Sequence, residues 1–304
     1  MLTPWGDLPV ADAHVHFFSH RFFTLLAQQK QCDLGSLYGI LGWERPAEDP
    51  VAFAATWLAE LDRHGVHKAM LIASLPPDLT SVAAAVQAYP ERFWGAAMVN
   101  PLDPLTIPAV APLVDSGQIR MLCLFPAMHG YSIQHDAVKN LIQAIPKARI
   151  FVHCGILSVG VRGKLGLPSR FDMKFSNPID LHALALEFPS TRFVVPHFGA
   201  GYWRETLMVA QLCPNVYLDT SSSNSWMRLQ APAVSLTTVF KETLAITGPN
   251  RLLFGSDSSF FPRGWNAAVA AAQIPALEEI GADAGLARRL FVDNLHDFCE
   301  LPTK

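Results

Sequence analysis

Two histidines near the start of the chain have the residue type and the spacing of metal ligands. His14 and His16 end an apolar stretch that begins near residue 10. In an extended strand, residues two apart point to the same side, so both imidazoles can reach one metal ion. The chain has 11 histidines, so such a pair can also arise by chance from ordinary surface or core residues. The pair therefore needs support from other parts of the sequence.

Three further polar residues follow short apolar runs in the same way. His153, His197 and Asp257 each come directly after such a run or two residues beyond it. Taken singly, a histidine there can be a hydrogen-bonded core residue, and Asp257 can cap a following turn. If the runs are parallel strands of one barrel, however, their ends meet at one rim. Metals such as zinc favour imidazole and carboxylate ligands, so the four strand ends together indicate a metal site.

The apolar pattern indicates the elements that would carry these residues. Short apolar runs alternate with longer segments of helical apolar spacing, as expected for parallel strands buried beneath helices. The expected strands lie near 10–14, 68–73, 93–98, 121–125, 150–153, 193–196, 216–219 and 252–254. The clearest helical segments are 51–64, 136–145, 178–188, 201–212 and 265–279. The pattern predicts an α/β fold, a (βα)8 TIM barrel.

The chain length fits one such barrel with insertions. Its 304 residues exceed the roughly 250 that a barrel needs, so we expect a single domain over 1–304 with the surplus in loops. The surplus lies at 28–50, which contains three glycines and Pro46, and at 155–177. Both segments follow strands, so we expect loop insertions on the C-terminal face, where barrel active sites are built.

Composition excludes several classes of protein. The chain has 23 basic and 26 acidic residues with no run of either sign, which excludes a strongly basic nucleic-acid binder. No apolar stretch approaches the roughly 20 residues that a membrane span requires. No secretory signal is evident at the start, so we expect a cytoplasmic protein. The five cysteines are odd in number and widely spaced, which suits reduced thiols.

Three motifs resemble the amidohydrolase superfamily, and more closely its amidohydrolase-2 branch. They are Asp-Ala-His-Val-His-Phe-Phe at 12–18, Phe-Gly-Ser-Asp at 254–257 and Asp-Asn-Leu-His-Asp-Phe at 293–298. That branch includes aminocarboxymuconate-semialdehyde decarboxylase and pyrone-dicarboxylate lactonase. The resemblance covers most of the chain, and the set of motifs in this order is specific for the superfamily. It is not specific for one reaction.

The resemblance implies a metal centre and a proton-transfer group. The implied ligands of one divalent ion, usually zinc with manganese or iron as alternatives, are His14, His16, His153 and Asp257. His197 would be the catalytic acid/base, with Asp257 sharing that work, although His197 as a fifth ligand stays open. Binuclear members carry a lysine at the end of the fourth strand. The run 119–126 has none, which favours a single metal.

Side chains in the expected loops are candidates for substrate contact. They are His129, Tyr131, Arg170, Ser221 and Trp203. Arg170, together with Arg162 and Lys164 in the same loop after His153, could hold a substrate carboxylate, for which arginine offers a bidentate partner. Each candidate also has a structural alternative, which is rim packing for the aromatic residues, solvation for the charges and turn hydrogen bonds for the serine.

The expected function is that of a mononuclear metal-dependent hydrolase. Metal-activated water would attack a small carbonyl compound such as a lactone or amide. The alternative is a metal-dependent non-oxidative decarboxylase of a small unsaturated or aromatic carboxylic acid, since the same ligands serve both reactions. A metal-free lactonase and a non-catalytic metal-binding scaffold also remain open. We expect a small-molecule substrate, no nucleic acid or membrane partner, and a possible homo-oligomer.

Overall fold

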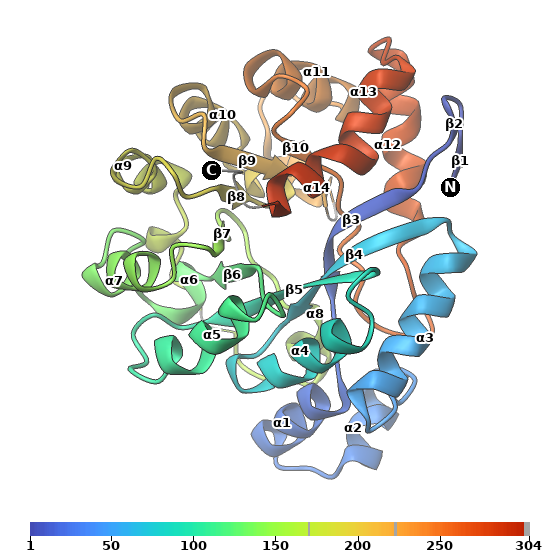
Figure 1. Cartoon of the computed structure of the whole chain (residues 1–304), viewed down its shortest axis with the longest axis vertical. Helices are drawn as coiled ribbons and strands as arrows, with labels where there is room; N and C mark the ends of the chain where they lie inside the picture. Colours follow the sequence, from blue (N-terminus) through green and yellow to red (C-terminus); the bar gives the residue numbers. More distant parts are fainter. Residues whose placement is uncertain (170, 222–223, 301–304) are drawn as a thin grey trace.

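Eight parallel strands form a barrel in the computed structural model, which describes residues 1–169, 171–221 and 224–300 (Figure 1). In chain order the strands are β3 (Val10–His16), β4 (Val66–Ala73), β5 (Phe93–Val99), β6 (Met121–Leu124), β7 (Arg149–Val152), β8 (Phe193–Val195), β9 (Val216–Asp219) and β10 (Leu252–Leu253). Neighbours in the chain are neighbours in the sheet. The Ala13 amide donates to the Phe254 carbonyl at 2.8 Å, which joins the first strand to the end of the last. The predicted (βα)8 TIM barrel is confirmed.

Alternation along the strands divides the apolar residues between two cores. In β4, Leu71 belongs to the large cluster between the strands and the outer helices, whereas Met70 and Ile72 belong to the cluster inside the barrel. All seven residues of β5 are buried, as expected for a strand covered on both faces. The continuous apolar runs of the sequence therefore reflect burial on both sides of the sheet.

Outer helices cover the barrel between successive strands. They are α3 (Pro50–Arg63), α4 (Leu79–Ala88), α5 (Thr106–Asp115), α7 (Asp136–Ala144), α9 (Leu181–Glu187), α10 (Trp203–Leu212), α11 (Leu236–Thr247) and α12 (Ala267–Glu279). The first of these begins where the Asp49 carboxylate accepts the amides of residues 51 and 52, with proline at its first position. Near the end of the chain, α13 (Ala284–Arg288) and α14 (Asn294–Cys299) follow, and the Arg149 side chain at the start of β7 donates to the Phe298 carbonyl. The final helix thus lies against the N-terminal ends of the strands.

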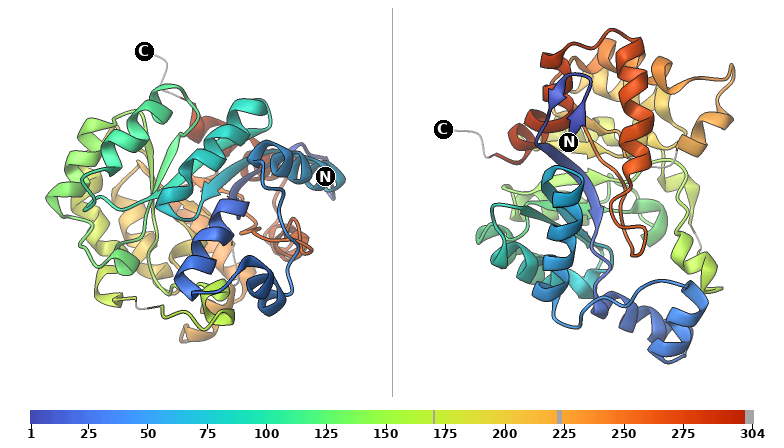
Figure 2. Two further views of the ribbon diagram at one scale, coloured as in Figure 1. Left: turned by 90° about the horizontal axis from the view of Figure 1, so that it is seen from below. Right: turned by 90° about the vertical axis from the view of Figure 1, so that its right-hand side faces the viewer.

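Two of the strand-to-helix connections form a cap beside the C-terminal ends of the strands. It contains α1 (His20–Lys30) and α2 (Leu34–Leu41) after β3, and α8 (Gly160–Lys164) after β7. Figure 2 shows α1 and α2, in blue, projecting at one end of the molecule. These helices share a third apolar cluster, separate from the two barrel cores. The surplus segments therefore lie on the predicted face.

The segment 28–50 is more helical than the sequence indicated. The sequence predicts a loop insertion at its glycines, yet Gly35 and Gly39 lie inside α2. The helix begins because the Asp33 carboxylate caps the Ser36 amide, and it ends at Gly42, whose φ of 65° is left-handed. Burial in the cap cluster outweighs the low helix propensity of glycine here.

The remaining elements are short. A hairpin of β1 (Leu2–Thr3) and β2 (Gly6–Asp7) precedes the barrel, and α6 (Pro126–His129) follows β6. Short 3-10 turns occupy Met173–Phe175, Pro178–Asp180 and Asn224–Leu229. Over the described part of the chain, none of the helices combines the length and the apolar character that crossing a membrane would take.

Candidate functional site

A cavity of about 670 Å³ opens at the C-terminal ends of the strands. Its inner part is lined by all five side chains that the sequence analysis assigned to metal binding or proton transfer: His14, His16, His153, His197 and Asp257. They come from the ends of β3, β7 and β8 and from the loop after β10. The barrel thus brings together residues that lie up to 243 positions apart in the sequence, because parallel strands end at one rim.

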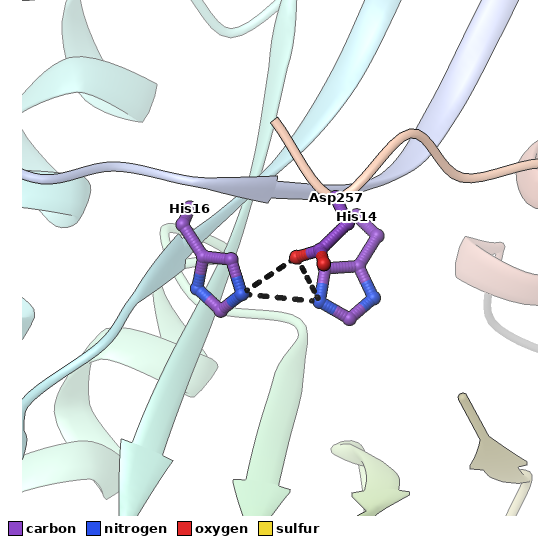
Figure 3. Close-up of side chains that lie close together, drawn as sticks. All are labelled: His14, His16 and Asp257. Carbon is purple, nitrogen blue, oxygen red and sulfur yellow. Dashed lines mark hydrogen bonds and ion pairs between the residues drawn. The ribbon is translucent and has the colours of Figure 1, made fainter. Parts of the chain in front are cut away.

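His14, His16 and Asp257 form a compact trio of possible ligands (Figure 3). The His16 Nε2 atom lies 3.2 Å from Asp257 Oδ1 and 3.3 Å from His14 Nε2, and His14 Nε2 lies 3.7 Å from the same carboxylate oxygen. Two ligand atoms bound to one tetrahedral zinc ion at about 2.1 Å are about 3.4 Å apart. The spacing of the three atoms therefore fits one ion of this size.

The opposite nitrogen of each imidazole in this trio is held by a hydrogen bond. His14 Nδ1 donates to Asp219 Oδ2 at 2.9 Å, since an ionised carboxylate can only accept. His16 Nδ1 lies 2.7 Å from Ser74 Oγ, which in turn lies 3.3 Å from the Ile72 carbonyl, an acceptor for the hydroxyl proton. His14 thus carries a proton on Nδ1, and the Ser74 contact lets His16 do the same when an ion takes the place of the proton between His16 Nε2 and Asp257. This is the orientation that metal ligation requires.

Asp219 is a central residue of the site that the sequence analysis does not name. Burial by itself would raise the pKa of this carboxyl, but the neighbouring His14 and hydrogen bonds lower it to about 2. Its Oδ1 atom accepts the amides of His197 at 3.0 Å and Ser221 at 2.9 Å, and the Ser221 hydroxyl as well. The signal for it was present, because Asp219 ends the apolar run 216–219 just as His153 ends its own run.

His197 is oriented by the same network. Its Nδ1 atom lies 2.9 Å from the Ser221 carbonyl, which can only accept, so the proton sits on Nδ1 and Nε2 is free to exchange a proton. Its backbone has a φ of 57°, and this conformation is held by the hydrogen bond that the His197 amide donates to Asp219 Oδ1. Burial, followed by the charge of His14, lowers the pKa of His197 and favours the neutral ring.

The other two predicted histidines, His153 and His197, lie outside the trio and differ in their contacts with it. His197 joins His14 and Asp219 in a second group of close polar atoms, but those atoms are already bonded to one another and to Ser221. His153 belongs to neither group among the described residues. Its ring lies 5.4 Å from that of His197 and stacks on Phe125. Ligation by His153 stays a prediction.

The buried carboxylate of Asp12 joins the first strand of the barrel to the segment that follows the last strand, beneath the trio. It accepts the amides of His14 at 2.9 Å and Ser256 at 3.0 Å, and the Trp265 indole at 2.8 Å. Burial raises the pKa of Asp12 to about 6. These hydrogen bonds hold the backbone at His14 and at Ser256, which directly precedes Asp257.

The residues predicted to contact substrate lie mostly behind the cavity wall. His129, Tyr131, Trp203 and Ser221 are not among its described lining residues. Tyr131 is buried in the outer core, and the Trp203 indole donates to Thr243 at 3.1 Å while its ring packs 6.5 Å from Trp226, which does line the cavity. Ser221 lies beneath the imidazoles that it orients. Arg170 falls outside the described residues.

The cavity wall is basic. Its cationic lining residues are Arg162, Lys164, Arg228 and Arg263, and Asp257 is the acidic one among the described residues. The Arg162 guanidinium is occupied by the Pro168 carbonyl and the Gln29 side chain. Arg228 makes no hydrogen bond or ion pair with a described residue. The sequence analysis considered Arg162 and Lys164 for this region but not the other two.

Known proteins share this architecture. The model of the family described as Amidohydrolase (Amidohydro_2) matches residues 11–294. A probable 2-pyrone-4,6-dicarboxylic acid hydrolase from Acinetobacter baumannii, solved with citric acid bound, is 17% identical with a TM-score of 0.59, over 96% of this chain and 99% of that chain. An amidohydrolase from Burkholderia multivorans with bound zinc is 14% identical with a TM-score of 0.62, over 96% and 99%. The protein fluG of Emericella nidulans is 34% identical over 87 residues, which are 29% of this chain but only 10% of fluG.

Proposed function

Because this chain belongs to the amidohydrolase family, we propose that its amidohydrolase-type site is that of a mononuclear metal-dependent hydrolase acting on a small lactone or amide. The observation that carries the proposal is the 3.2–3.7 Å spacing of the His14, His16 and Asp257 ligand atoms. The zinc bound to the Burkholderia multivorans amidohydrolase supports a divalent ion of the same kind. We further propose His153 as the fourth ligand, since it lines the same cavity floor.

The side chains have distinct tasks in this reaction. A divalent ion held by the trio supplies Lewis acidity, which polarises a carbonyl and lowers the pKa of water. His197 Nε2 accepts a proton from the attacking water and then delivers it to the departing oxygen or nitrogen. Asp219 and Ser74 keep the protons of the ligand imidazoles on Nδ1, away from the cavity. The bond cleaved is the acyl C–O or C–N bond, and the water oxygen ends in the product carboxylate.

Three alanine variants and a control test these assignments. His14→Ala and Asp257→Ala should lose both the bound metal and hydrolysis, since each removes a ligand atom. His197→Ala should retain most of the metal and lose turnover. His67→Ala alters an exposed histidine on β4 and should change neither. The measurements are elemental analysis of the purified protein and hydrolysis of a lactone and amide panel before and after chelation. Loss of the metal from His197→Ala would overturn the acid/base role.

The basic wall favours a second candidate, non-oxidative decarboxylation. Arg228 and Arg263 would hold a substrate carboxylate near the trio, and arginine suits that task because of its forked geometry. His197 would then protonate the carbon from which carbon dioxide departs. Release of carbon dioxide from unsaturated or aromatic acids, without hydrolysis of lactones or amides, would select this reaction.

A further inference from the structure

Beside its cationic residues, the cavity has an extended apolar lining. It includes Phe18, Phe22, Leu26, Trp43 and Phe260. It also includes aliphatic residues around α8: Leu157, Val159 and Val161. Three separate loops, after β3, β7 and β10, supply these residues. The chain thus builds an apolar chamber over its candidate metal site from segments that the barrel itself does not need.

The aromatic wall starts directly beside a candidate ligand. The Phe18 ring lies 5.7 Å from the His16 ring and stacks on Phe22 at 4.1 Å. Phe18 also lies 6.2 Å from Trp43, which stacks on Phe260 at 4.0 Å. The aromatic contacts therefore run continuously from the candidate ligand His16 to Phe260. An apolar group that contacts this wall must be attached close to the reacting carbon.

The wall is formed before any ligand arrives. Phe22 and Leu26, one helical turn apart on α1, are almost fully buried in the cap cluster. Lys164 Nζ lies 5.4 Å from the centre of the Trp43 ring, and the Arg263 guanidinium lies 4.6 Å from that of Phe260. These packing and cation–π contacts hold the rings in place. A rigid apolar wall binds an apolar group with little cost in ordering.

We propose that the substrate carries an aromatic or similarly bulky cyclic apolar group next to its reacting carbonyl, bound against the aromatic wall that begins at Phe18 beside His16. This inference rests on the proposed function for the identity of the reacting group. The cavity volume of about 670 Å³ lies within the range of about 300–1,000 Å³ typical of sites for drug-sized ligands. A ring therefore fits beside the reacting group, and its burial is favoured by the hydrophobic effect.

The test measures binding of unreactive acids, so it does not depend on turnover. Acetate, cyclohexanecarboxylate, 2-naphthoate and citrate are titrated calorimetrically into the protein as purified and again after chelation. Acetate, cyclohexanecarboxylate and 2-naphthoate each carry one carboxylate, so the ratio of their affinities isolates the contribution of the ring, whereas citrate carries three and measures the contribution of charge. Trp43→Gln removes part of the aromatic wall, and Val159→Asn alters the aliphatic part of the lining. Trp5→Gln is the control, because Trp5 is also half-buried but donates to the Ala282 carbonyl outside the cavity.

The expected result is one site per chain that binds 2-naphthoate at least about tenfold more tightly than acetate, a difference of about 1.4 kcal/mol. Trp43→Gln and Val159→Asn should each reduce this ratio severalfold, and Trp5→Gln should preserve it. A ratio below about twofold, tighter binding of citrate than of 2-naphthoate, or a ratio insensitive to both wall variants would overturn the inference. Ring selectivity without hydrolysis of any lactone or amide would refute the proposed reaction alone. Hydrolysis without ring selectivity would refute the inference alone.

Discussion

Replacing Asp219 by asparagine should weaken metal binding at the trio although Asp219 is not one of its three members. Its Oδ1 atom accepts two backbone amides, from His197 and Ser221, and asparagine can retain those bonds through its oxygen. The new NH2 group must then face His14 Nδ1, where Asp219 Oδ2 accepts at 2.9 Å. Two donors cannot share this contact. The His14 proton therefore moves to Nε2, which occupies the lone pair that the trio needs.

The size of the effect follows from this change of tautomer. Loss of a hydrogen-bond partner of a metal-ligating histidine usually reduces metal affinity by about 10–100-fold, or about 1.4–2.7 kcal/mol. Asp219→Asn should fall in the upper half of this range, because the substitution disfavours the correct tautomer as well as removing the partner. Hydrolysis at saturating metal should fall further, since His197 is held by the same carboxylate.

The assay is competition for zinc with a fluorescent chelator, at constant pH and ionic strength. Asp78→Asn is the matched control, because Asp78 is also fully buried but is bonded to the hydroxyls of Ser19 and Ser81 and to no histidine. Thermal unfolding verifies that both variants fold. A zinc affinity of Asp219→Asn within threefold of the unmodified protein would refute the tautomer argument, as would an equal loss in Asp78→Asn.

Three further outcomes are expected from the same contacts. Ser74→Ala should lower zinc affinity by about tenfold, the low end of the usual range, because a neutral hydroxyl orients its imidazole; the chelator assay checks this. Burial raises the pKa of Asp12 from 3.8 to about 6, so the folded state holds this proton more tightly than the unfolded state does, and metal-free stability should fall by about 2 kcal/mol from pH 4 to pH 6; urea unfolding of Asp12→Asn should lack that slope. Gly255→Ala should lower the free energy of unfolding by about 1–3 kcal/mol, because the added carbon would lie 2.9 Å from His14 Cβ. Gly39→Ala, where the added carbon meets open space on a helix, should raise the free energy of unfolding by up to about 1 kcal/mol in the same measurement.

The barrel could be predicted from the sequence because its signal is local. Each strand is a short apolar run, and burial on both faces is recorded in the run itself, as in Phe93–Val99. The positions of His14, His16 and Asp257 then follow from topology, since β3 and the end of β10 are joined by hydrogen bonds. Asp219 also ends a strand, so topology places it at the same rim, but the serines that follow it are equally typical of a polar turn and conceal this signal.

The loops could not be predicted in the same way, because their side-chain directions depend on contacts distant in sequence. The helix Leu34–Leu41 exists because its apolar side packs with Val161 and Leu165 in the cap cluster, which no local pattern records. Trp203 was expected to wall the cavity and lies behind Trp226 instead. Phe22 and Trp43, from the segment around the expected loop insertion, line the cavity and were not considered.

Chemistry and selectivity are carried by different packing units in this fold. The trio is held by polar residues at the strand ends, through Asp12, Ser74 and Asp219. The apolar wall belongs to the cap cluster, which is separate from both barrel cores. Substitutions in distant units without shared partners are close to additive. A change at Trp43 should therefore alter which acids bind while leaving zinc affinity unchanged, whereas a change at Asp219 should alter zinc affinity and leave the preference for a ring intact.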